Sequence, residues 1–522
     1  MLEKKTLIVG IQLALGVGLI APVHAAQNLS NTNLNGDNFT FTGGLILTNS
    51  QLKFNPITAG TYGAMNVSGG DYAGSGSTIT MSSFLDAGGG TLANQGSNRI
   101  LINGNASGQT TLVVNNNGGP GASTDLNGST FNDAGEGISL AQVSGSSAAN
   151  VFSLQGDYVA VGTYQYRLYA YAPGQSDAGQ RLVSADADGH WDYRLQNAKV
   201  ATGIVPVSPV NPGGATPPTP AYRPGLVPQA PSYLVQQNAL FAYGQQTINA
   251  LHQRLGETGG AHTPDEGNGE LYVRAFGGDH RYASNLTVGE YGYDYDQDIQ
   301  GLQIGGNWLK LDGDAGSLRV GLALSSGKSH VEPGSVTGVE PTVFWKGQYV
   351  PVEVSRSKTR ADSFATTVTW QHASGFYVDG VIGASQYQSD VFTPYRDGKV
   401  ARLVSNDVFA SVEAGYGWAV SDFATIEPQA QVSWQKLDTD RVTDVDGVVV
   451  DLGTPEQFVW RVGARALFTP AVGADGSVLT QYIKLNYYGS EGPEQRAFLS
   501  GQRFVTGDYG HIAEFGYGLT AS

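Results

Sequence analysis

The amino-acid sequence predicts an all-β protein: an N-terminal parallel β-helix (solenoid) followed by a C-terminal antiparallel transmembrane β-barrel with a helix in its lumen. Three observations predict this class. Only 14% of the 522 residues are charged, whereas 72 are glycine and 22 are proline. Short strand-like runs separated by Asn and Gly fill the first third of the chain. Runs of about ten residues that alternate apolar and polar side chains fill the last half.

Residues 1–25 have the pattern of an export signal peptide. Lys4 and Lys5 precede an apolar run from Leu7 to Ile20, and Val23-His24-Ala25 provides a cleavage site of small residues. The alternative, a transmembrane anchor, is disfavoured because a spanning helix needs about 20 apolar residues. The sequence therefore predicts an exported protein.

Residues 26–197 predict the solenoid. Its short strands are bounded by Asn, Gly or Asp, residues that tolerate the turns between the rungs of a solenoid. Clear examples are the runs 39–42, 44–48, 99–102 and 111–114. No strict repeat is present, and a β-sandwich is the alternative fold for this part.

Residues 198–231 contain nine prolines and predict an extended linker. Residues 232–256 predict a helix, because the segment starts after Pro231, has no internal proline and stops at Gly256. Its polar residues are almost all amides, which suits neither lipid nor an ordinary solvated surface. A helix of about 36 Å can cross the ~30 Å hydrocarbon layer if polar groups surround it.

Residues 268–522 predict the barrel. In the run 426–435, every odd position is polar and every even position is apolar or proline. Such alternation is typical of transmembrane barrel strands, although a soluble antiparallel sheet shows it too. About ten strands can be placed, starting near residues 271, 297, 318, 361, 376, 406, 424, 458, 480 and 511.

Several segments resemble the autotransporters of Gram-negative bacteria (type V secretion), in particular their pertactin-like branch. The segments 145–169 and 190–197 resemble the C-terminal part of such passengers, residues 222–257 resemble the linker and intrabarrel helix, and residues 271–278 resemble the first barrel strand. The resemblance implies that residues 26–197 are a surface passenger, with an autochaperone-like segment at 145–197 that begins passenger folding outside the cell.

The resemblance also implies a twelve-stranded barrel around the helix. The last run in this sequence, residues 511–522, resembles the third strand from the end of that family. We therefore expect a barrel that lacks the last two strands and has exposed edges, which lipid does not tolerate.

The composition excludes several kinds of chemistry. With 29 Lys and Arg against 45 Asp and Glu, the chain lacks the basic surface that a nucleic-acid partner requires. It has no cysteine, which excludes disulfides and thiol chemistry. His190 is the one histidine between the signal and the linker, and no G-x-S-x-G motif accompanies it. Asp and Asn do not follow the EF-hand pattern, so neither a metal site nor a cofactor is expected.

The resemblance implies one reaction, a single self-cleavage between Asn249 and Ala250, in which the Asn side chain attacks its own backbone carbonyl. The amide is a weak nucleophile and needs a nearby base. Candidate carboxylates on the polar strand faces are Asp379, Glu413, Glu427 and Glu514. Their simpler role is to pair in a watery lumen with Arg319, Arg461, Arg465 and Lys484.

The sequence as a whole predicts an autotransporter that inserts a barrel in the outer membrane and displays or secretes its own passenger, an adhesin without enzymatic activity. The alternatives are a surface enzyme carried by the same translocator and a soluble β-structural adhesin without a barrel. The expected partners are outer-membrane lipid, the barrel-assembly machinery, periplasmic chaperones and a host-cell surface ligand.

Overall fold

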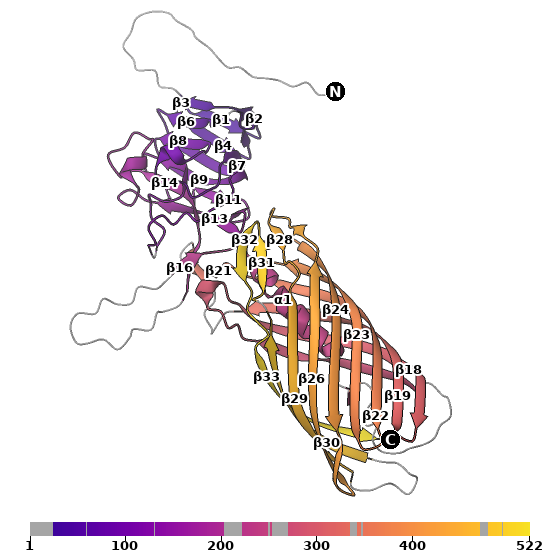
Figure 1. Ribbon diagram of the computed structural model, residues 1–522. Helices are drawn as coiled ribbons and strands as arrows, with labels where there is room; N and C mark the ends of the chain where they lie inside the picture. The colour runs from indigo at the N-terminus through magenta and orange to yellow at the C-terminus, as the bar shows by residue number, and fades with distance from the viewer. Residues whose placement is uncertain are drawn as a thin grey trace, which may run out of the picture.

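The computed structural model describes residues 25–58, 60–129, 131–202, 222–248, 251–252, 270–334, 342–345, 348–469, 479–492 and 494–521. The signal-peptide prediction falls almost entirely outside these residues, as does the prediction for most of the linker. Figure 1 shows a stacked β-structure from the N-terminal part above a curled sheet of long strands from the C-terminal part. The described residues are all-β apart from α1 (Ala230–Ile248), the helical residues 251–252 and three short 3-10 turns, at 92–94, 178–180 and 288–290.

The passenger is built on two sheets of stacked short strands. All pairs in the first sheet are parallel. It contains β1 (Gln27–Ser30), β2 (Asn33–Gly36), β4 (Leu45–Thr48), β5 (Gln51–Phe54), β7 (Tyr72–Ser83), β9 (Ala106–Asn116) and β11 (Phe152–Leu154). The second sheet is parallel through β3 (Phe39–Thr42), β6 (Ala64–Ser68), β8 (Arg99–Asn103) and β10 (Ile138–Val143).

The parallel register stacks like side chains from rung to rung. Leu52 lies opposite Ile79, Ile79 opposite Leu112 and Leu112 opposite Leu154, and all four are buried. Burial of such aliphatic columns is the main stabilising force of a solenoid, because each rung covers the apolar face of the next. The arrangement confirms the predicted solenoid and excludes the β-sandwich.

One glycine shows how closely the rungs approach. Gly108 has φ +77°, and a Cβ at this position would lie 1.9 Å from the backbone oxygen of Gly74 on the neighbouring strand. Only glycine adopts this conformation and fits this space.

The end of the passenger that faces the barrel is antiparallel. β12 (Val159–Val161), β13 (Tyr164–Tyr171) and β14 (Trp191–Asn197) pair antiparallel, and β14 also pairs antiparallel with β10. These strands continue the second sheet beyond its last parallel rung. They form the base of the passenger, next to the barrel (Figure 1).

Acidification is expected to weaken the passenger through His190. Burial lowers the pKa of this imidazole, although the nearby Asp192 carboxylate opposes part of the shift. The unfolded chain takes up a proton near pH 6.5, and the folded chain only at lower pH. The stabilising contribution is therefore complete above about pH 6.5 and is lost as the pH falls towards the folded pKa.

The measurement is the urea concentration at which a protease degrades the passenger, compared at neutral and mildly acidic pH. In the variant His190→Gln, which has no titrating ring, this midpoint should depend less on pH. An unchanged pH dependence in the variant would contradict the assignment.

The segment between passenger and barrel forms a short ladder and then α1. β15 (Lys199–Ala201) pairs antiparallel with β16 (Tyr222–Pro224). The helix begins at Ala230, two residues before the predicted start, because proline is well accommodated in the first turn of a helix and Pro231 stands there. Every residue of α1 is buried except Gln245 and Gln246.

Ten long antiparallel strands form the barrel wall around α1 (Figure 1). In sheet order they are β17 (Glu270–Tyr282), β18 (Asp294–Gly313), β19 (Gly316–Gly334), β22 (Arg356–His372), β23 (Phe376–Phe392), β24 (Lys399–Tyr416), β26 (Ala424–Thr439), β29 (Glu456–Phe468), β30 (Leu479–Glu491) and β33 (His511–Ala521). β17 and β33 are the two edges of this sheet. The observed and predicted starts differ most at β24, at residues 399 and 406.

Shorter strands lie at the ends of the wall. β25 (Trp418–Ser421) pairs antiparallel with the start of β26, and β20 (Thr342–Trp345) pairs with β21 (Gln348–Pro351). Long loops at the passenger end form a separate sheet of β27 (Val442–Thr443), β28 (Val449–Asp451), β31 (Arg496–Leu499) and β32 (Gln502–Val505). Turns at the opposite end, such as residues 314–315 and 373–375, are short.

The alternation in the sequence corresponds to the two faces of this wall. Side chains that point away from α1 are apolar and exposed, among them Ile304, Leu324, Ile382, Val412, Leu485 and Phe515. Their neighbours in sequence point inward and are mostly polar and buried. Among the residues described, no helix is both long and apolar enough to cross a membrane.

Candidate functional site

The amide side chains of α1 explain how a polar helix is held inside the wall. Gln236 donates to the Ser389 hydroxyl at 3.0 Å, and Gln245 donates to the Ser433 hydroxyl at 3.0 Å. Asn238 donates to the backbone oxygen of Thr506 at 2.9 Å. These uncharged groups satisfy polar strand faces without the cost of burying unpaired charge. The helix therefore fills the lumen, as the amide pattern predicts.

A glycine within α1 marks the closest approach of helix and wall. A Cβ on Gly244 would lie 1.9 Å from the side-chain oxygen of Gln435 on β26. Glycine is a poor helix former. At this position it is favoured nevertheless, because without a side chain the helix backbone can contact the wall.

Four of the predicted lumenal residues lie in one row across neighbouring strands. In the strand register, Thr369 lies between Arg319 and Asp379. Asp379 is in turn opposite Glu413. Gln431 lies between Glu413 and Arg461. Their strand positions share one face, so the row lines the lumen near the short-turn end of the barrel.

Glu413 is the centre of a buried cluster at the end of the described helical residues. Its carboxylate lies 3.1 Å from the guanidinium of Arg461 and accepts a hydrogen bond of 2.7 Å from the Tyr377 hydroxyl. It also accepts one of 3.2 Å from the backbone N–H of Leu251. These three donors hold the carboxylate in one orientation, because charge-assisted hydrogen bonds have a narrow preferred geometry.

Glu427 lies beside this cluster. Its carboxylate is 2.8 Å from the His252 imidazole and 3.7 Å from the guanidinium of Arg465. The Tyr377 hydroxyl is 3.5 Å from the same carboxylate, so one tyrosine lies between both glutamates. The wall thus brings Glu413, Glu427 and their arginines together around residues 251–252.

The other predicted residues have different partners. Asp379 accepts from the Thr369 hydroxyl at 2.6 Å, and Arg319 donates to the side-chain oxygen of Gln371 at 2.6 Å. Glu514 pairs with Lys484 and accepts from the Tyr488 hydroxyl at 2.8 Å. The structure places Glu514 and Lys484 in a separate cluster on β30 and β33. Asn249 and Ala250 lie outside the described residues.

Sequence reasoning missed two members of the lumenal cluster. Tyr377 is two residues from Asp379 on β23 and therefore shares its inward face, which is a signal that the alternation contained. His252 is the second, and nothing in a single sequence connects it to Glu427, 175 positions away.

A second polar cluster closes the mouth of the barrel and was not predicted. Arg223 on β16 makes two parallel bonds to the Glu353 carboxylate, at 2.6 and 2.7 Å. Tyr293 donates to the same carboxylate at 2.7 Å, and the backbone N–H of Leu226 donates at 2.7 Å. All of these groups are buried. The chain is therefore fixed to the segments that precede β18 and β22 at the mouth, just before it enters the lumen.

The base of the passenger contacts the loops around the mouth. Tyr158 donates to Asp446 at 2.9 Å, and Arg396 donates to the other oxygen of Asp446 at 2.7 Å. The Arg396 guanidinium also lies 4.1 Å from the centre of the Tyr158 ring. Thr163 donates to the side-chain oxygen of Gln502 at 2.6 Å. The passenger and the barrel loops thus share a hydrogen-bonded junction.

The described residues contain no group of three or more His, Asp or Glu side chains with the geometry of a metal site.

Two family models match this chain. The model described as the autotransporter beta-domain matches residues 271–522, and the one described as Autochaperone Domain Type 1 matches residues 42–168. The second match includes residues 145–168 of the segment that resembles an autochaperone.

Relatives and a solved structure are similar over large parts of the chain. The adhesin BmaC autotransporter of Brucella suis biovar 1 (strain 1330) is 28% identical over 435 residues, 79% of this chain and 11% of the relative. The uncharacterized protein YuaQ of Escherichia coli (strain K12) is 25% identical over 472 residues, 85% of this chain and 29% of the relative. The chain thus spans less than a third of either relative. The match to the solved transport unit of the autotransporter AIDA-I from Escherichia coli includes 56% of this chain and 88% of the solved chain, with a TM-score of 0.43 and 14% identity.

The lumenal helix, the wall with its apolar outer face and the two family matches agree. Residues 271–522 belong to the autotransporter beta-domain family, whose members are outer-membrane β-barrels, and the chain has the organisation of an autotransporter, with a β-helix before the barrel.

Proposed function

We propose that the passenger is an adhesin that remains attached to the barrel and is displayed at the cell surface. The junction carries this proposal, because Tyr158 and Thr163 of the passenger are bonded to Asp446 and Gln502 of the barrel loops. A passenger held in one place suits display better than release. The relative BmaC is named an adhesin, which supports the same role.

The passenger surface suits binding better than catalysis. His190 is fully buried and lies 3.2 Å from the Ser176 hydroxyl, so it is not placed to act as a base on a substrate from solution. A solenoid offers a long lateral surface, which is the usual binding surface of such folds. The proposed partners are a host-cell surface ligand for the passenger, lipid around the barrel, and the barrel-assembly machinery and periplasmic chaperones during assembly.

The test compares bacteria that display the natural protein with bacteria that display a variant lacking residues 26–197. The natural protein and the deletion variant both keep the barrel, and heat-dependent gel mobility of the outer-membrane fraction verifies that it is folded. Adhesion to cultured host cells should fall to the level of bacteria without the protein when the passenger is removed. Equal adhesion of both strains would refute the adhesin role, and passenger recovered mainly from the medium would refute display.

We further propose that a fraction of the chains cuts itself once at Asn249. The side-chain nitrogen would attack the backbone carbonyl carbon of Asn249 and close a succinimide. The bond to the nitrogen of Ala250 breaks, and that nitrogen gains the proton that the amide loses. We propose Glu413 as the base. Its carboxylate accepts a hydrogen bond from the backbone N–H of Leu251, two residues beyond Asn249.

The cleavage proposal is tested by mass spectrometry of any released passenger. A C-terminus at Asn249 is expected, and cleavage should be reduced at least about tenfold in Glu413→Gln, which keeps the shape but loses the base. Asp379→Asn is the matched control, because Asp379 lies in the same row and bonds to Thr369. A different C-terminus, or equal loss in both variants, would contradict the role of Glu413.

A further inference from the structure

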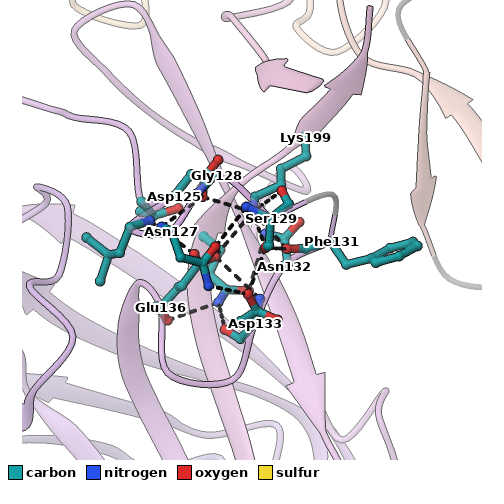
Figure 2. A network of polar contacts seen from close by, with 12 residues as sticks. Asp125, Asn127, Gly128, Ser129, Phe131, Asn132, Asp133, Glu136 and Lys199 are labelled. Atoms are coloured by element: carbon teal, nitrogen blue, oxygen red, sulfur yellow. Dashed lines mark hydrogen bonds and ion pairs between the residues drawn. The ribbon is translucent and has the colours of Figure 1, made fainter. Parts of the chain in front are cut away.

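A loop at the base of the passenger encloses the side chain of a single lysine (Figure 2). The loop runs from Asp125 to Glu136, and Lys199 is the first residue of β15. The lysine ammonium lies 2.7 Å from the backbone oxygen of Phe131 and 3.0 Å from that of Ser129. The Ser129 hydroxyl is at 3.1 Å, and the Asp125 and Glu136 carboxylates are at 3.3 and 3.4 Å. Five oxygens therefore surround one cationic nitrogen.

The residues of this loop have the spacing of an EF-hand calcium loop. Counted from Asp125, oxygen-bearing side chains stand at positions 1, 3, 5, 9 and 12, and the backbone oxygen at position 7 faces the ammonium. These are the positions that supply calcium ligands in an EF-hand. The strict EF-hand pattern is absent, as expected from sequence, because position 6 is Thr130 instead of glycine.

Hydrogen bonds within the loop hold these oxygens in place. The Asp133 carboxylate accepts from the Asn127 amide at 2.9 Å and from the Ser129 hydroxyl at 2.7 Å. Burial raises the pKa of Asp133, but these bonds and the Lys199 charge outweigh it, so this pKa lies below its ordinary value. The carboxylate is thus kept in its charged form.

The loop has more acidic side chains than the single lysine ammonium can neutralise. Asp125, Asp133 and Glu136 bring three carboxylates to the loop against the single ammonium, although burial raises the pKa of Glu136. The Lys199 side chain is 6% exposed and that of Glu136 is 3% exposed. A buried ammonium is tolerated only when paired and hydrogen-bonded. The excess of negative charge and the oxygen-only ligands are the features that a divalent hard cation requires.

We infer that the described residues of this loop, 125–129 and 131–136, form a calcium-type cation site whose cation is the ammonium of Lys199. The lysine orders the loop without metal and anchors the chain where it leaves the passenger for the barrel. Because the ammonium occupies the centre, the natural protein takes up no calcium at this loop. Without the lysine charge, calcium enters, and the oxygens move inward from the 2.7–3.4 Å they keep around nitrogen towards the roughly 2.3–2.6 Å of calcium ligands.

The test uses the full-length protein in outer membranes and the variant Lys199→Met, which keeps the length of the side chain and removes its charge. The readout is the temperature at which a protease degrades the passenger, measured in a chelator and in roughly millimolar calcium. We expect the natural protein to be indifferent to calcium. Lys199→Met should lose several degrees in the chelator and regain most of the loss in calcium, with magnesium far less effective.

Two further variants separate this site from general effects of charge. Lys53→Met removes an exposed lysine from β5 and should behave as the natural protein does. The double variant Lys199→Met with Glu136→Gln loses the last carboxylate of the loop and should lose the calcium response. If Lys199→Met folds only in calcium, the inference is supported. It is overturned if this variant folds in neither condition, folds without responding to calcium, or responds no more than the natural protein.

Discussion

Replacing Arg223 with methionine is expected to destabilise the mouth of the barrel by about 3–5 kcal/mol. The variant removes both guanidinium bonds to Glu353 and leaves that carboxylate buried, with donors only from Tyr293 and the N–H of Leu226. It also removes the guanidinium from the face of the Tyr291 ring, 4.3 Å away. An uncompensated buried charge costs more than the pair contributed, which is why the effect is large.

The measurement for Arg223→Met is the temperature at which the folded outer-membrane band changes its mobility on a gel. The double variant Arg223→Met with Glu353→Leu removes both charges and should recover a large part of the loss, because replacement of a whole buried pair is often close to neutral. A double variant no more stable than the single one would show that the charge imbalance is not the cause.

Replacing Arg194 with methionine is expected to cost the passenger a similar amount, about 3–5 kcal/mol. Arg194 and its partner Asp192 are completely buried, with 2.7 Å between them. The guanidinium also donates to the backbone oxygens of Glu136 and Gly137 and to the side chain of Gln180. The variant therefore leaves one buried charge and three buried acceptors without this donor.

The urea midpoint for protease digestion of the passenger measures this effect. The matched control is Arg181→Met, because Arg181 is exposed and its replacement should stay within about 0.5 kcal/mol. A loss no greater than that of the control would contradict the assigned role of Arg194. The barrel should keep its heat-dependent mobility in both variants, since the change is confined to the passenger.

The barrel wall and the solenoid could be predicted because each leaves a local record in the sequence. A strand with one face outward and one face inward alternates with a period of two, as in β26, so nearly all starts were found within a few residues. The amides of α1 indicated a polar surrounding, and Gln236 and Gln245 do bond to hydroxyls of the wall. The lumenal position of the predicted charged residues likewise followed from the strand face they occupy.

The clusters that join distant parts of the chain could not be predicted. Arg223 and Glu353 are 130 positions apart, and Lys199 is more than 60 positions from the loop that encloses it. Neither pair has a periodic pattern, because both are formed by loops or strand ends whose places depend on the completed fold. Arg223, Glu353 and Lys199 look like ordinary surface charges in the sequence, and only their burial distinguishes them.

The charged residues of the lumen also determine how the wall acts on a chain passing through it. Asp379, Glu413, Glu427 and Glu514 carry four negative charges, while Arg319, Arg461, Arg465 and Lys484 carry four positive ones, several of them in contact across neighbouring strands. The field of close opposite charges falls off over a short distance, so an extended segment in the middle of the lumen feels little net pull of either sign. The eight charges thus add little net field of either sign to their part of the lumen.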